Sequence, residues 1–127
     1  MFKAFVCLSM IFCHIVDDYY LQGVLANLKQ KEWWKKNAPQ SLYACDYIMA
    51  LAMHSFSWSF MIMLPIAVSI QFKVGIRYII MLAANALIHG YVDHMKANKR
   101  SINLIQDQSI HLLQIAITSL LFTFGLL

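Results

Sequence analysis

Long apolar runs, separated by short stretches rich in lysine, dominate this chain. Residues 47–72 and 108–127 contain no Asp, Glu, Lys or Arg. Each run reaches the roughly 20 residues that cross a bilayer as a helix. A third run lies between Arg77 and Asp93, and a fourth, near the N-terminus, is interrupted by a pair of Asp residues. The pattern predicts one all-α domain over 1–127, an integral membrane four-helix bundle with spans at about 4–28, 42–70, 74–96 and 103–126.

Composition supports a lipid environment. Hydrophobic residues make up 61% of the chain and charged residues 13%, whereas a soluble domain carries about 25% charge. A soluble helical bundle is the alternative, and the uncharged C-terminal run argues against it. No small-x-small cleavage site follows the first apolar run, so we expect a retained helix rather than a signal peptide. The three cysteines are too few and too irregularly spaced for a disulfide framework or a zinc motif.

The lysines and arginines predict an orientation. Seven of the ten lie in two connecting segments, 29–40 and 96–102. By the positive-inside rule both segments are cytoplasmic, in a bacterial inner (plasma) membrane, and Trp33 and Trp34 are interfacial anchors. Basic residues placed between apolar runs do not form the single solvated face that nucleic-acid binding requires, so no nucleic-acid partner is expected.

Polar residues inside the predicted spans recur at helical spacing. Residues four apart share one face of a helix, and each span carries one such stripe with an acid and a histidine. The sequence contains three His–acid pairs at this spacing, where chance predicts roughly 0.5. The stripes are His14, Asp18 and Gln22; Asp46, His54 and Ser57; Asn85, His89, Asp93 and Lys96; and Asn103, Asp107, His111, Gln114 and Thr118.

Buried acids in a membrane need compensation, because an ionised Asp at a span centre costs about 2.5–3.5 kcal/mol on insertion scales. One or two divalent ions would supply it, and imidazole with carboxylate suits Zn, Mn, Fe or Ni without distinguishing them. A metal-free polar network that only fixes helix packing is the alternative. The expected metal ligands are His14, Asp18, His54, His89, Asp93, Asp107 and His111. The expected groups that orient them are Gln22, Asn85, Asn103, Gln108 and Gln114.

The residues of three of these stripes resemble the motifs of a known protein family. HIVDDYYLQ at 14–22 (HxxxDxxxQ), HGYVDHMK at 89–96 (HxxxDxxK) and DQSIH at 107–111 (DQxxH) resemble a family of small bacterial and phage-encoded multi-span membrane proteins of unknown function. The HxxxD arrangement is also distantly similar to membrane-bound metal-dependent hydrolases. The family resemblance implies these signature positions: His14, Asp18, Gln22, His54, His89, Asp93, Lys96, Asp107, Gln108 and His111.

These features favour a metal-dependent hydrolase acting on a lipid or lipid-linked phosphate at the cytoplasmic face. The metal would activate water and polarise a phosphoryl oxygen, Asp17 or Asp46 would act as general base, and Lys96 would steady developing negative charge. An ion, metal or proton transporter, with a pore supplied by a homo-oligomer, is a second possibility. A third is a non-enzymatic adaptor whose loop KQKEWWKK recruits a partner or anionic lipid.

Overall fold

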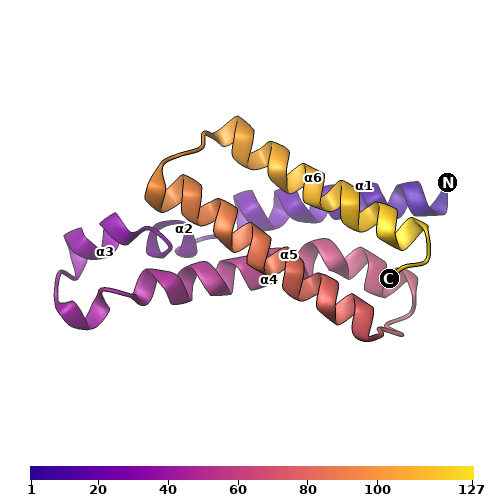
Figure 1. Cartoon of the computed structure of the whole chain (residues 1–127), viewed down its shortest axis with the longest axis horizontal. Helices are drawn as coiled ribbons and strands as arrows, with labels where there is room; N and C mark the ends of the chain where they lie inside the picture. Colours follow the sequence, from indigo (N-terminus) through magenta and orange to yellow (C-terminus); the bar gives the residue numbers. More distant parts are fainter.

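The computed structural model describes residues 1–127, and every regular element in it is a helix, which confirms the all-α prediction. Four helices are long (Figure 1): α1 (Phe2–Ile15), α4 (Asp46–Ser69), α5 (Ile76–His94) and α6 (Leu104–Thr123). The π-helical turns Val16–Leu21 and Met95–Lys99 extend α1 and α5 without a break. The short helices α2 (Leu25–Leu28) and α3 (Lys31–Asn37) and a 3-10 turn (Ser41–Tyr43) connect α1 to α4.

The four long helices enclose a common interior. Helix α4 packs against α1 and α5, and α6 also packs against α1 and α5. Both chain termini lie at one end, with α2 and α3 at the other (Figure 1). At the terminal end Lys3 Nζ donates to the carbonyl of Thr123 at 2.7 Å, so the first and last helices are joined there.

The two basic segments lie together at the opposite end, as the sequence predicts. The backbone N–H of Lys31 donates to Asn98 Oδ1 at 2.7 Å, and Asn98 Nδ2 donates to the carbonyl of Lys29 at 3.0 Å. The segment 29–40 is nevertheless not a simple loop, because it contains α3. On that helix Lys35 Nζ donates to the Glu32 carboxylate at 2.6 Å and holds the pKa of Glu32 below its usual range.

The expected first span, 4–28, is too long. Its helix ends at Leu21, and Gly23 adopts φ +51°, a left-handed conformation that favours glycine and turns the chain into α2. The expected span 42–70 agrees with α4 and its preceding turn, and α4 continues through Pro65. The spans 74–96 and 103–126 agree with α5 and α6 to within a few residues, except that the π-helical turn carries α5 on to Lys99.

The interior has an apolar half and a polar half. At the terminal end the core consists of closely packed hydrophobic side chains, including Met10, Ile62 and Ile66, none of them accessible to solvent. Towards α2 and α3 the interior is instead lined by His, Asp, Asn and Gln side chains. This division places the candidate chemistry in one half of the molecule, next to the basic segments.

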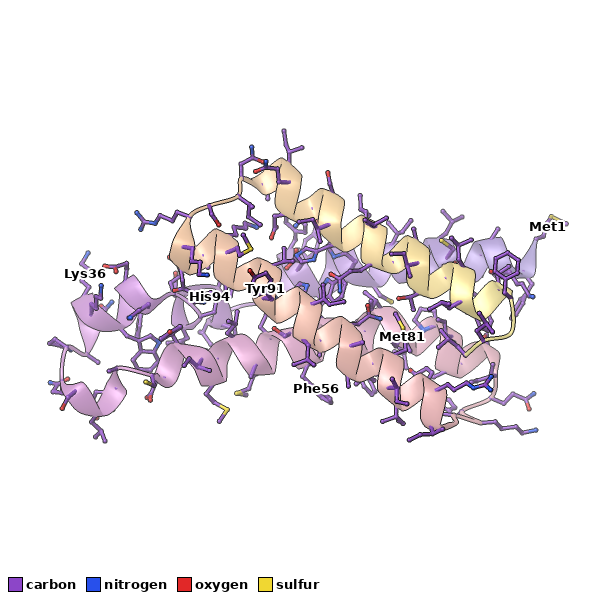
Figure 2. The ribbon with its side chains drawn as sticks, viewed as in Figure 1. Met1, Lys36, Phe56, Met81, Tyr91 and His94 are labelled. Carbon is purple, nitrogen blue, oxygen red and sulfur yellow. The ribbon has the colours of Figure 1, made fainter.

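The outer surface is apolar. Large hydrophobic side chains such as Leu8, Phe56, Leu87 and Leu113 are more than half exposed on all four long helices, and Phe56 points away from its helix in Figure 2. Two helical segments, Phe2–Leu21 and Ser41–Ser69, are long and apolar enough to cross a membrane. Helices α5 and α6 do not meet the same criterion, although they expose apolar side chains in the same way.

Candidate metal centre

Six of the seven expected metal ligands meet in the polar half of the interior. Asp18 comes from the π-helical turn after α1, His54 from α4, and the other four from α5 and α6. Their donor atoms form three groups, each with all its atoms within 4.8 Å of one another, and each could hold a metal ion. The groups are Asp18, His54 and His89; His89, Asp93 and His111; and Asp18, Asp107 and His111.

The first group is centred on His54 Nε2. This atom lies 3.1 Å from His89 Nε2, 3.4 Å from Asp18 Oδ1 and 3.2 Å from Asp93 Oδ2. Ligand atoms 2.0–2.1 Å from a tetrahedral ion are roughly 3.3–3.4 Å apart. The spacing around His54 therefore suits a single small cation.

Asp17 lies behind His54 and is almost completely buried, although its place off the stripe predicts an interfacial position. Its Oδ1 accepts from Ser57 Oγ at 2.6 Å, and its Oδ2 lies 4.0 Å from His54 Nδ1. This separation is too long for a hydrogen bond, and the buried Asp17 Oδ2 has no hydrogen-bond partner. The π-helical turn Val16–Leu21 explains why two consecutive Asp residues both face the interior, because i→i+5 bonding places an additional residue in the turn.

The third group contains unsatisfied buried atoms. His111 Nε2 and Asp107 Oδ1 lie 3.4 Å apart, and neither has a hydrogen-bond partner. The other ring nitrogen of His111 is 3.2 Å from Gln114 Oε1, and Gln114 Nε2 donates to the Asn85 carbonyl. Since Gln114 Oε1 can only accept, Nδ1 of His111 carries a proton, and in the neutral ring the Nε2 lone pair faces Asp107. Buried polar atoms without partners are rare and costly, and a cation between them would satisfy both.

His14 is placed beside the cluster rather than in it. Trp58 Nε1 donates to His14 Nδ1 at 2.8 Å, and His14 Nε2 lies 3.0 Å from Gln108 Oε1. Gln108 Nε2 in turn donates to Asp18 Oδ2 and Asp107 Oδ2, both at 3.0 Å. Both ring nitrogens of His14 are therefore engaged, and its position suits orientation of these two carboxylates rather than metal ligation.

Two lysines neutralise part of the buried negative charge. Lys29 Nζ contacts Asp93 Oδ2 at 2.5 Å, with both side chains buried, and Lys96 Nζ contacts Asp107 Oδ2 at 2.6 Å. The sequence pattern predicts that Lys29 is one of the exposed basic residues of a loop. That prediction is wrong, because Lys29 is buried. The signal in the sequence is Gly23, whose turn allows α2 to fold back and bring Lys29 to the interior.

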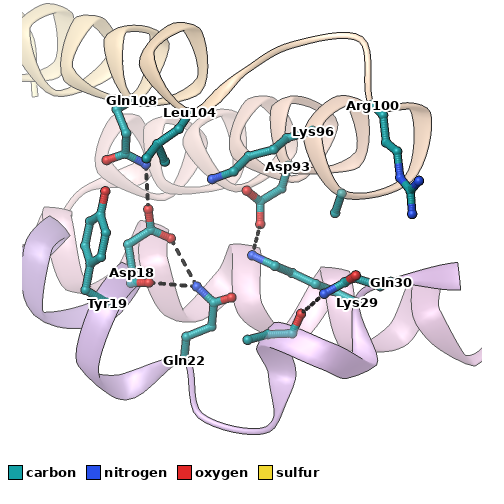
Figure 3. Close-up of a pocket in the computed structure, with 12 residues that line it drawn as sticks. Asp18, Tyr19, Gln22, Lys29, Gln30, Asp93, Lys96, Arg100, Leu104 and Gln108 are labelled. Carbon is teal, nitrogen blue, oxygen red and sulfur yellow. Dashed lines mark hydrogen bonds and ion pairs between the residues drawn. The ribbon is translucent and has the colours of Figure 1, made fainter. Parts of the chain in front are cut away.

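A cavity of about 390 Å³ opens beside the cluster (Figure 3). Its walls carry two carboxylates, three cationic groups and three amides, contributed by Asp18, Asp93, Lys29, Lys96, Arg100, Gln22, Gln30 and Gln108. Gln22 Nε2 donates to the Asp18 carbonyl at 2.8 Å and lies 3.4 Å from Asp18 Oδ1, as expected of a group that orients a ligand. This volume lies within the range of small-molecule sites.

Two expected site residues lie elsewhere. Asp46 is the first residue of α4, two turns before His54, and makes no hydrogen bond or ion pair with the cluster. Asn103 caps α6: its Oδ1 accepts from the Gln106 backbone N–H at 2.9 Å, so it orients no ligand. Neither of the two general-base candidates, Asp17 and Asp46, lines the cavity.

Searches against family models, curated proteins and solved structures give no match to this chain. The resemblance carried by HxxxDxxxQ, HxxxDxxK and DQxxH therefore stays a prediction. The functional proposal therefore rests on the geometry of the candidate metal centre and the adjoining cavity.

Proposed function

We propose that the chain is an integral membrane protein, spanning the bacterial inner membrane with its four long helices as a bundle. The basic segments at one end would be cytoplasmic. The distribution of polar and apolar residues supports this, because it is the reverse of that in a soluble protein. Of the 25 buried residues 14 are polar or charged, while large apolar side chains cover the outside. In soluble proteins buried Asp and Lys are uncommon, and extended apolar surfaces mark interaction sites or membrane contact.

Within that membrane protein, we propose a metal-dependent hydrolase acting on a lipid or lipid-linked phosphate. The observation that carries this proposal is the cavity, which joins two candidate metal ligands to three cationic side chains. A divalent ion held there would polarise a phosphoryl oxygen and lower the pKa of a coordinated water. The cavity lies at the end of the helices that carries the basic segments, where a phosphate headgroup would be reached from the cytoplasmic side.

Residues that line the cavity would have separate roles in hydrolysis of the phosphate ester. Water adds to phosphorus and the ester P–O bond breaks, giving inorganic phosphate and an alcohol. The proton released by the water passes to Asp93, a carboxylate that lines the cavity, and is then given to the departing alkoxide oxygen. Lys96 and Arg100 offset the negative charge that develops on the phosphoryl oxygens.

Transport is the weaker alternative. A pathway for an ion or proton needs polar groups along the whole span. Here the interior nearest the termini is mostly apolar, with Ile62, Met63 and Ile66 inaccessible to solvent. The buried Asn85 and Thr118 reach this layer, but they hydrogen-bond to each other. None of the buried Asp, His and Lys side chains belongs to the layer, so the interior supports binding and chemistry from one side.

The first experiment measures metal and activity together. Protein purified in mild detergent without chelator should contain a divalent metal by elemental analysis, and should release phosphate from phosphatidic acid vesicles. We expect Asp93→Asn and Asp107→Asn to bind less metal and lose activity, and Glu32→Gln, at an exposed carboxylate on α3, to retain both. Unchanged metal in both Asp variants, or phosphate release unaffected by chelator, would contradict the proposal. Metal-dependent ion flux in liposomes without phosphate release would favour transport.

A further inference from the structure

The cluster holds two donor groups that share only one residue. Asp18, His54 and His89 form one, and Asp18, Asp107 and His111 form the other. We infer that the protein binds two divalent ions, one in each group, bridged by the Asp18 carboxylate. This inference rests on the metal binding in the proposed function and adds the number of ions, their ligands and the charge of the substrate that completes the centre.

The two oxygens of Asp18 face different groups. Oδ1 is 3.4 Å from His54 Nε2, in the first group. Oδ2 accepts from Gln108 Nε2 at 3.0 Å, and the same nitrogen donates to Asp107 in the second group. A carboxylate oxygen has a second lone pair beyond this hydrogen bond. The carboxylate is therefore oriented to give one oxygen to each ion.

The two carboxylate oxygens of Asp107 also have different surroundings. Its Oδ2 is held by Lys96 and Gln108, at 2.6 and 3.0 Å. Its Oδ1 has no partner and lies 3.4 Å from the unpartnered His111 Nε2. Both atoms are fully buried, so the second group offers two unsatisfied donors to a cation independently of the first group.

The two groups adjoin one another. His89 of the first group and His111 of the second have ring centroids 4.2 Å apart, and with Asp93 they form the remaining donor group. In two-metal hydrolytic sites the ions lie about 3.5–4 Å apart. Adjacent rings from α5 and α6, together with the Asp18 carboxylate that belongs to both groups, are compatible with ions at such a separation.

Charge gives the class of ligand that completes the centre. The carboxylates of Asp17, Asp18, Asp93 and Asp107 face Lys29 and Lys96, and Arg100 lines the same cavity, which leaves one negative charge if the imidazoles are neutral. One divalent ion makes the centre singly positive, and a second makes it triply positive. A phosphate monoester carries about −1.5 to −2 at neutral pH, so it offsets most of that charge when it occupies the cavity. The ligand expected with the second ion is thus a phosphate monoester.

The test is a metal titration read in two ways. Metal-stripped protein in detergent is loaded with Mn²⁺, the bound ions are counted by elemental analysis, and electron paramagnetic resonance reports exchange coupling. We expect two ions per chain and a coupled spectrum, with the second ion bound at least tenfold more tightly when inorganic phosphate is present. His54→Ala and His111→Ala should each retain one ion and lose the coupling, Asp18→Asn should lose the coupling, and Glu32→Gln should keep both ions.

One ion per chain at saturation, or two ions without coupling, would overturn the inference, and this readout on the unmutated protein does not depend on how any variant folds. If one ion is found and phosphate release still requires metal, the two-ion centre fails while the proposed hydrolase stands. If no ion binds, both fail. Variants are compared only where size-exclusion profiles and helical circular dichroism match the unmutated protein, and His54→Asn replaces His54→Ala if the latter does not fold.

Discussion

His54 and His89 face each other through their Nε2 atoms, 3.1 Å apart, across the contact between α4 and α5. Trp58, one turn after His54, stacks on the His89 ring with centroids 4.2 Å apart and planes 17° from parallel. Stacking and burial fix both rings in place before any ligand arrives. A pair of imidazoles held in this way is preorganised for a shared cation, because little side-chain freedom remains to be lost on binding.

The same tryptophan supports the centre through His14, and this can be tested. Trp58→Phe removes the N–H that donates to His14 Nδ1 but keeps an aromatic ring against His89. His14 hydrogen-bonds to Gln108, and Gln108 donates to the carboxylates of Asp18 and Asp107. We therefore expect the Mn²⁺ affinity to fall about 10–100-fold, as for other groups that orient metal ligands. Trp33→Phe, on α3 away from the cluster, is the control. Equal Mn²⁺ affinity in both variants would show that His14 does not position the carboxylates.

Lys29 gives a second prediction, on the stability of the metal-free protein. Lys29→Met leaves the buried Asp93 carboxylate without its cation, and breaking a buried pair typically costs about 3–5 kcal/mol. We expect a large drop in Tm in detergent with chelator, and a much smaller drop when Mn²⁺ is present, because the metal compensates the carboxylate. Lys35→Met removes an exposed pair with Glu32 and should change stability by less than about 1 kcal/mol. An equal drop in Tm with and without Mn²⁺ would mean that metal and Lys29 do not share Asp93.

Local helix geometry explains what the sequence could predict. Residues four apart necessarily share a face, so the spacing of His89 with Asp93 and of Asp107 with His111 predicted two halves of the cluster. That the halves meet follows from the order of the helices alone, since both pairs approach the same end. The same rule selected His14, which lies on the correct face, but Trp58 and Gln108 occupy its ring nitrogens. Such competition between neighbours depends on tertiary packing, which spacing does not encode.

Departures from regular helix explain what the sequence could not predict. Asp17 lies in a π-helical turn and faces the interior near His54, whereas the stripe at spacing four predicts only Asp18 there. Lys29 reaches Asp93 because the chain reverses at Gly23 and α2 returns to the interior. Asp46 and Asn103 have suitable chemistry for a site but lie at the first turns of their helices, where Asn103 is used as a cap.

Membrane immersion can be tested by comparing two equally exposed leucines. Leu87, on α5, is 76% exposed, and Leu42, in the 3-10 turn at the basic end, is 77% exposed. If α5 crosses the bilayer, Leu87→Arg places a charge in the hydrocarbon region, at a cost of about 2.5–3.5 kcal/mol on insertion scales. We expect Leu87→Arg to reduce the membrane-inserted fraction in a glycosylation or protease-protection assay and Leu42→Arg to leave it unchanged. Equal, small effects of both substitutions would indicate a solvated surface at Leu87.

The orientation of the chain is tested by its cysteines. Cys45 is exposed at the basic end, immediately before α4, whereas Cys7 and Cys13 lie within α1 and are partly buried. If the basic end is cytoplasmic, a membrane-impermeant maleimide should label Cys45 in inside-out vesicles and not in right-side-out vesicles, and Cys45→Ser should abolish that labelling. The α1 cysteines should stay unlabelled in both preparations until detergent is added, because a bilayer around α1 excludes the reagent. Labelling of Cys45 in right-side-out vesicles would reverse the orientation and place the metal centre and its cavity at the outer face, where a cytoplasmic phosphate could not reach it.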